Sequence, residues 1–163
     1  MNQPTVSQTS APPRIAFVQA GWHADIVRQG HAGFVAECAR LWPGAPPHVA
    51  VHQLPGAFEI PLLAQRLARS GTVDAIVACA LVVDGGIYRH EFVAGAVIDA
   101  LMRVQLDAGV PVFSVVLTPK DFHEHETHRA FFSQHFVAKG AEAARACAQT
   151  LAAHAALARH APE

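Results

Sequence analysis

The segment 83–91, Val-Asp-Gly-Gly-Ile-Tyr-Arg-His-Glu, holds the densest set of side chains that could do chemistry. Gly85 and Gly86 precede a predicted helix, where free backbone N–H groups can bind an anion, although glycine pairs are also common in simple turns. Arg89 stays protonated, so it can hold or stabilise an anion. His90 can transfer a proton near neutral pH. The segment could therefore bind an anion and move a proton beside it.

Two earlier segments supply a flat aromatic ring and another helix start. Trp22 follows Gly21, and it can either stack on a flat heterocycle or pack beneath the helix that follows. Residues 55–61, Pro-Gly-Ala-Phe-Glu-Ile-Pro, predict a turn into a helix whose first N–H groups point toward the ligand side. Glu59 lies in that first turn, where it either contacts a ligand or only balances the helix dipole.

A fourth segment is rich in histidine. His123, His125 and His128 have a spacing that a metal ion could use, but glutamates alternate with them. A solvated loop is the preferred interpretation, and we predict no metal site. Lys139 at the start of the last predicted helix could complete a cationic pocket. The chain has no dinucleotide, Walker or nucleophile-elbow motif, which argues against nucleotide hydrolysis and esterase chemistry.

Short apolar runs alternate with helical periods along the chain. The predicted strands are 14–20, 48–54, 74–83 and 111–118. The predicted helices are 24–41, one that carries Ile60, Leu63, Ala64 and Leu67, one from about 91 to 108, and 138 to about 159. The stretch 119–136 has no clean period and is predicted to be a loop with a short helix. Right-handed crossovers then give an α/β three-layer sandwich with a four-stranded parallel sheet, whose ligand loops follow the strands' carboxyl ends.

The composition indicates one domain that associates with itself. The chain has 163 residues, of which 52% are hydrophobic and 15% charged, against about 25% charged in typical domains. We expect a domain over 14–159, a flexible arm over 1–13, and a homo-oligomer that covers the apolar surplus.

Charge and cysteine content exclude several classes of partner. A net charge of -1 without a basic stripe makes nucleic acid an unexpected partner. No apolar run is long enough for a membrane span, and the N-terminus lacks the pattern of a signal peptide, so we expect a cytoplasmic protein without membrane contact. Cys38, Cys79 and Cys147 lie far apart in apolar surroundings and are predicted to be reduced core thiols.

Together these segments resemble the lumazine synthase family over about residues 14–155. The motif Gly-Ala-Phe-Glu-Ile-Pro at 56–61 is the most specific piece, supported by 85–93, by Gly-Val-Pro-Val at 109–112 and by Lys139-Gly140. The resemblance implies flavodoxin-like subunits that form pentamers, decamers or larger shells, with active sites between neighbours and a terminal arm that can add a strand to a neighbour's sheet. It implies condensation of 5-amino-6-(D-ribitylamino)uracil with 3,4-dihydroxy-2-butanone 4-phosphate to 6,7-dimethyl-8-ribityllumazine in riboflavin biosynthesis, without a cofactor.

The resemblance also assigns expected roles to individual residues. Trp22 would stack on the pyrimidine. Other substrate contacts are implied for Ala57, Phe58, Glu59, Leu81, Val82, Val83, Gly86, Ile87 and, from the neighbouring subunit, Ser114.

The chain departs from the common family pattern at two points. Arg89 aligns with the family's proton-transferring histidine, so either His90 does that work from one position along or Arg89 acts electrostatically. We predict that Arg89 lies in the site and assists phosphate departure by its charge, and that His90 packs or contacts another subunit. The stretch 118–139 is longer than the common version, so the phosphate-binding arginine aligns with His128 or Arg129.

The glycine loop and Trp22 resemble a divergent branch of the family whose assemblies are decamers. Two other functions remain open from the sequence. The same pocket could hold lumazine or a flavin with little turnover, and the fold alone would permit a flavodoxin-like electron carrier.

Overall fold

Four parallel strands form the central layer of the fold in a computed structural model that describes residues 11–159. The strands are β1 (Arg14–Ala20), β2 (His48–Leu54), β3 (Ala75–Leu81) and β4 (Val112–Leu117). The helices are α1 (Ala24–Leu41), α2 (Ile60–Arg69), α3 (His90–Ala108) and α4 (Glu126–Arg159), with a short 3-10 helix η1 (Ala57–Glu59) before α2. The expected α/β sandwich is confirmed. Most of the predicted arm, residues 1–10, lies outside the described part of the chain.

The strand order β2-β1-β3-β4 places β1 and β3 at the centre of the sheet. All of β3 and all of β1 after Arg14 are buried, which explains why both strands are apolar on both faces except at Gln19. Side chains alternate between the two faces: Phe17 belongs to one core cluster and Val18 to the other. The core is therefore divided by the sheet into two layers.

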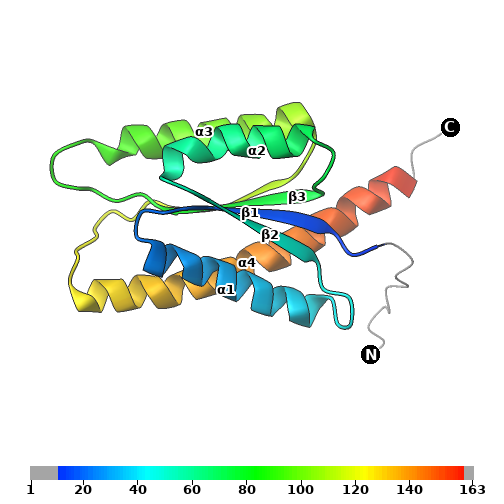
Figure 1. Ribbon diagram of the computed structural model, residues 1–163, viewed down its shortest axis with the longest axis horizontal. Coiled ribbons are helices and arrows are strands. Elements are labelled where there is room, and N and C mark those ends of the chain that lie inside the picture. The colour runs from blue at the N-terminus through cyan, green and yellow to red at the C-terminus, as the bar shows by residue number, and fades with distance from the viewer. Residues whose placement is uncertain (1–10, 160–163) are drawn as a thin grey trace.

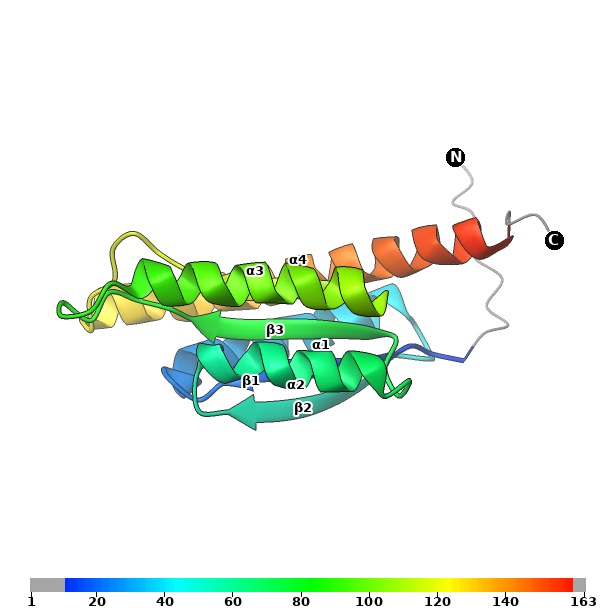
Figure 2. The same cartoon turned by 90° about the horizontal axis from the view of Figure 1, so that it is seen from above.

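The helices cover the two faces in pairs. Figure 1 shows α2 and α3 on one side of the sheet and α1 and α4 on the other. Seen from above, the C-terminal end of α4 runs on past the other helices (Figure 2). Within residues 11–159, no helix has the length and hydropathy needed to cross a membrane.

The prediction for 119–136 is wrong in its second half, because α4 begins at Glu126 rather than at Ala138. Phe132 and Phe136 are buried four residues apart, and Gly140 continues the same face. His128 and His135 on this stretch obscure the helical period, and Gly140 resembles the start of a helix rather than part of its packed face. The candidate residues of this stretch consequently stand on the first turn of a long, well-packed helix.

The buried face of α3 consists of Ala94, Val97, Leu101 and Val104, whereas the neighbouring Val93 is exposed. The helix ends at Gly109, whose backbone φ of 67° is left-handed and whose N–H donates to the Gln105 carbonyl. Glycine adopts this conformation without a steric penalty, so Gly109 in the Gly-Val-Pro-Val motif at 109–112 ends α3.

The contact between α1 and α4 is closer than side chains would allow. A Cβ atom added to Gly33 would lie 2.0 Å from the Val137 carbonyl oxygen, and one added to Gly140 would lie 2.0 Å from the Gly30 carbonyl oxygen. The two helices therefore meet backbone to backbone. Glu37 adds an ion pair across this contact, with its Oε1 3.0 Å from the Arg145 guanidinium.

The three cysteines lie in the same core layer as this contact. Cys38, Cys79 and Cys147 are buried free thiols, as predicted. Burial raises the pKa of Cys38 and of Cys147 to about 12, and the pKa of Cys79 is raised as well. A protonated thiol is a poor nucleophile, so these residues act as small apolar groups.

We expect Gly33→Ala to destabilise the protein by an amount at the upper end of the ~1–3 kcal/mol typical of overpacking, because backbone atoms of α4 would have to move. Gly95→Ala is the matched control, since Gly95 also lies within a helix but has no atom within 4 Å of an added Cβ. This control should raise stability slightly, as alanine favours the helix. Thermal unfolding of both variants is the measurement, and equal melting temperatures would contradict the close contact.

Candidate active site

All four long helices begin at the same end of the sheet, where the strands end (Figure 1). The turn between β1 and α1 and the turn after β2 are joined there, because the Gly21 N–H donates to the Leu54 carbonyl at 2.7 Å. Trp22 is 72% exposed, so the alternative of a tryptophan packed beneath α1 is wrong. The ring is available to stack on a ligand.

Trp22 lies close to the motif that follows β2. A Cβ atom added to Gly56 would lie 3.9 Å from Trp22 Cδ1 and 3.2 Å from Glu59 Oε2, so the ring and the carboxylate flank this glycine. Phe58 is exposed beside them, and Ala57 is partly buried. The first two loops thus bring an aromatic face, a carboxylate and the start of η1 and α2 together.

The loop after β3 leaves its polar groups open to solvent. Leu81 and Val82 are buried at the end of the strand, with the Val82 N–H donating to the Leu117 carbonyl, and Val83 is partly exposed. Gly86 has a left-handed φ of 79°, and its N–H donates to Asp84 Oδ1 at 2.7 Å. This donor, expected to hold an anion, is already paired with a carboxylate of the same loop.

Arg89 and His90 face different surroundings. The Arg89 guanidinium is exposed and lies 4.7 Å from the centre of the Phe92 ring, a cation–π contact. The side chain of His90 is only 14% exposed, and its Nδ1 lies 3.7 Å from Glu91 Oε2. The exposed arginine is open to a ligand at this edge, whereas the histidine belongs to the first turn of α3.

The loop before α4 packs onto the turn that carries Trp22. Phe122 is buried and makes an edge contact with the ring of His23, at 5.1 Å between ring centres. His128 Nδ1 accepts a hydrogen bond from the His123 N–H at 3.1 Å, which requires this nitrogen to be unprotonated. Among residues 11–159, no group of three or more histidine, cysteine or acidic residues is arranged to hold a metal ion.

Arg129 is held by two carboxylates from different parts of the chain. One terminal nitrogen donates to Glu124 Oε2 at 2.6 Å, and the other donates to Asp25 in the first turn of α1. Desolvation pushes the pKa of Asp25 up, but the hydrogen bond and charge of Arg129 outweigh it and lower this pKa. The carboxylate is therefore ionised and bound to the guanidinium at neutral pH.

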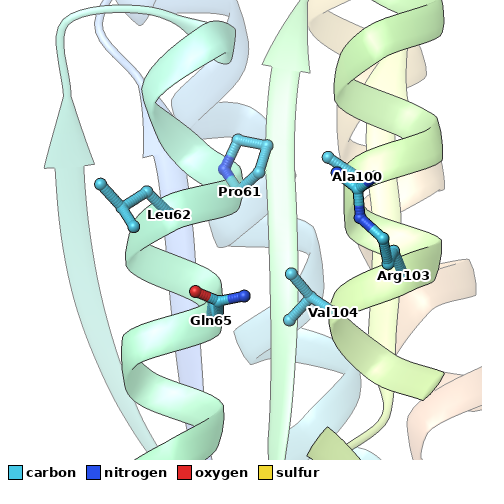
Figure 3. Close-up of a pocket in the computed structure, with 6 residues that line it drawn as sticks. All are labelled: Pro61, Leu62, Gln65, Ala100, Arg103 and Val104. Carbon is cyan, nitrogen blue, oxygen red and sulfur yellow. The ribbon is translucent and has the colours of Figure 1, made fainter. Parts of the chain in front are cut away.

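Two hollows accompany these loops. One, of about 440 Å³, lies between the start of α3 and the end of β4, and is lined by His90, Glu91, Ala94, Gly95, Ile98, Thr118, Pro119 and Lys120. The other is a shallow groove between α2 and α3, lined by Pro61, Leu62, Gln65, Ala100, Arg103 and Val104 (Figure 3). The second groove contains none of the predicted site residues.

Some predicted site residues stand apart from this cluster within one subunit. Ile87 is exposed at the tip of its loop. Ser114 is exposed on the edge strand β4, paired in register with Ala78 rather than placed on a loop at the strand ends. This position suits its expected role as a contribution from a neighbouring subunit.

The fold is that of a flavodoxin-like α/β protein, and its candidate ligand-binding groups lie at the carboxyl edge of the sheet. The model of the family 6,7-dimethyl-8-ribityllumazine synthase matches residues 12–155. The 6,7-dimethyl-8-ribityllumazine synthase of Rhodococcus erythropolis is 62% identical over 139 residues, covering 85% of this chain and 88% of the relative.

Two further relatives are each named 6,7-dimethyl-8-ribityllumazine synthase 2. The protein of Pseudomonas syringae pv. tomato is 56% identical over 91% of this chain and 89% of its own length. That of Bradyrhizobium diazoefficiens is 58% identical over 86% of this chain and 83% of its own length. The chain belongs to the 6,7-dimethyl-8-ribityllumazine synthase family, which are transferases of riboflavin biosynthesis.

Sequence reasoning missed several groups at this edge. Asp25 and Glu124 hold Arg129, while Lys120 and Thr118 line the hollow beside His90. An acidic residue in a helix's first turn is readable from the sequence, but only as a complement to the helix dipole. Its pairing with an arginine 104 residues away depends on how α1 and α4 cross.

We expect Trp22→Ala to weaken binding of a ribitylaminouracil analogue by the ~1–3 kcal/mol that base–aromatic stacking contributes. Trp22→Phe should retain most of the affinity, because phenylalanine keeps a π-face. Calorimetric titration of the three proteins with the analogue measures this difference. Equal losses in both variants would contradict a stacking role.

Proposed function

We propose that this protein condenses 5-amino-6-(D-ribitylamino)uracil with 3,4-dihydroxy-2-butanone 4-phosphate, releasing phosphate and water and forming 6,7-dimethyl-8-ribityllumazine. The main supporting observation is the open Trp22 ring beside Gly56 and Glu59, in the motif most specific to the family. A flat ring next to a carboxylate and a helix start suits a pyrimidine with a hydroxylated side chain. Low-turnover binding is not favoured, because the similar proteins are named synthases.

The reaction needs positioning more than strong chemical catalysis. The 5-amino group attacks the ketone to form an imine with loss of water. Phosphate is then eliminated together with the proton of the neighbouring carbon, which leaves an enol that tautomerises to a ketone. The ribitylamino nitrogen attacks this ketone and closes the new ring with loss of a second water. No electron acceptor is required, so no cofactor is expected. Holding the two substrates together contributes much of the acceleration. Trp22, Ala57, Phe58 and Glu59 would hold the pyrimidine and its ribityl chain, with Leu81, Val82 and Val83 at its edge.

For the phosphate, we propose Gly86 and Ile87 of the glycine loop together with Arg129. Arg129 is preferred over His128 because its charge does not depend on pH near neutrality. His128 also uses Nδ1 as an acceptor toward the His123 N–H, and protonation would break this bond. Arg89 is proposed to assist departure of the phosphate by its charge.

The active site is proposed to lie between neighbouring subunits of a pentamer. Two such pentamers are proposed to pair into a decamer, and the protein is proposed to be cytoplasmic. Large side chains are exposed at the loop edge and along α3, namely Trp22, Phe58, Ile87, Tyr88, Phe92, Ile98, Met102 and Leu106. Apolar surface of this kind is typical of faces that another subunit covers. A neighbour would then supply Ser114 to complete the site.

The direct test follows lumazine absorbance after the purified protein is mixed with both substrates, with sedimentation of the same sample to measure its assembly. We expect absorbance to rise only when both substrates are present, and the protein to sediment as a pentamer or a larger assembly. A protein that binds lumazine but forms none would be a binding protein, and this outcome would overturn the proposal.

We expect Arg89→Ala to slow turnover, because a charge that stabilises the departing phosphate is lost. His90→Ala should have a smaller effect on kcat, since the His90 side chain is only 14% exposed and lies beside Glu91. Loss of a general acid or base costs ~10²–10⁴-fold in rate. Steady-state kinetics of both variants, each checked for intact assembly, distinguishes the roles. A loss of that size confined to His90→Ala would assign proton transfer to His90 and contradict our assignment.

A further inference from the structure

The Arg129 guanidinium is already paired with two carboxylates of the chain. Both of its terminal nitrogens are engaged, one by Glu124 in the preceding loop and one by Asp25 in α1. The three groups come from three segments of the chain, so the arrangement is a built cluster rather than a chance contact along one helix. An anion that binds this guanidinium therefore has to displace at least one of these carboxylates.

The charges in this cluster oppose simple addition of a phosphate. One guanidinium and two carboxylates sum to a single negative charge, and a phosphate monoester brings about −1.5 to −2 more at neutral pH. A phosphate that joined the intact cluster would therefore be repelled. Both carboxylates are more than half exposed, and exposed ion pairs are weak, so displacement of one of them costs little.

Glu124 also reaches the turn that carries Trp22. Its Oε1 lies 3.6 Å from His23 Nδ1, while its other oxygen accepts from Arg129. His23 is held in a left-handed backbone conformation with φ of 51°, which is rare outside glycine, and its ring contacts Phe122. A shift of Glu124 therefore changes the partner of the residue directly after Trp22.

We propose that Glu124 is a positioning residue that competes with the substrate phosphate for Arg129 and links the phosphate site to the Trp22 turn. Without phosphate, Glu124 shares Arg129 with Asp25. When phosphate binds Arg129, Glu124 gives up this contact and its side chain shifts, which alters its contact with His23. The inference rests on the proposed function in one respect, because it takes Arg129 as the phosphate ligand.

The first experiment titrates inorganic phosphate into the full-length protein by calorimetry. Glu124→Gln should tighten phosphate binding by up to about fivefold, the equivalent of an exposed ion pair worth about 1 kcal/mol. A misfolded variant would lose affinity for phosphate, so a gain in affinity cannot be attributed to misfolding. Glu126→Gln is the matched control, since it removes the same charge two residues along in the first turn of α4. Arg129→Met should lose phosphate binding.

The second experiment reads the link to Trp22. The chain has two tryptophans, so Trp22 is the sole one in a Trp42→Phe background. Phosphate should change Trp22 fluorescence in this background, and the further change Glu124→Gln should remove that response while phosphate still binds.

In the titrations, the inference is overturned if Glu124→Gln and Glu126→Gln change phosphate binding equally, if Glu124→Gln weakens it, or if Arg129→Met leaves it unchanged. In the fluorescence experiment, it is overturned if phosphate causes no change in the Trp42→Phe protein, or if the change persists after Glu124→Gln. None of these requires turnover. Failure of the protein to form lumazine would overturn the proposed function alone, because the phosphate titrations would still measure the competition. Normal turnover with an inert Glu124 would leave the proposed function intact and end this inference.

Discussion

The backbone contact between α1 and α4 determines the geometry of the loop edge. Gly30, Gly33 and Gly140 remove the side chains that would otherwise separate the two helices. Because the axes approach so closely, the first turn of α4 comes beside the first turn of α1, and Arg129 reaches Asp25. The loop before α4 is then confined to the space above the Trp22 turn, where Phe122 packs on His23. A packing constraint in the core thus sets which charges meet at the site.

The parallel sheet brings the loops together but does not enclose them. Every strand ends at the same edge, and the buried central strands fix where the turns start. Trp22, Phe58 and Tyr88 nevertheless remain exposed, as does Arg89. Catalysis by proximity and charge requires water to be excluded, since charge interactions are weak in a high dielectric. These candidate groups therefore remain open to water in a single chain, and the proposed neighbour in the assembly would be needed to cover them.

Regular elements could be predicted because their signals are local. The structure gives the strands 14–20 and 48–54 and the helix 24–41 the bounds that short apolar runs and a helical period predict. The start of α4 could not be predicted, because the buried face of this helix mixes phenylalanine with Gly140 and lies among histidines. The sequence identified Trp22, Glu59 and the glycine loop as candidates. It could not identify the partners of Arg129, since those depend on a helix crossing between residues 104 apart.

Two donors that we propose for the substrate phosphate are paired with carboxylates of the chain. The Gly86 N–H is held by Asp84, as Arg129 is held by Asp25 and Glu124. These pairs hold a flexible loop and a long side chain near one geometry before a ligand arrives, which reduces the entropy lost on binding. They remain replaceable because they are exposed and weak. A phosphate carries more charge than a single carboxylate, so it competes well for the same donors. Under this proposal, the same carboxylates order these donors before phosphate binds and release them to it.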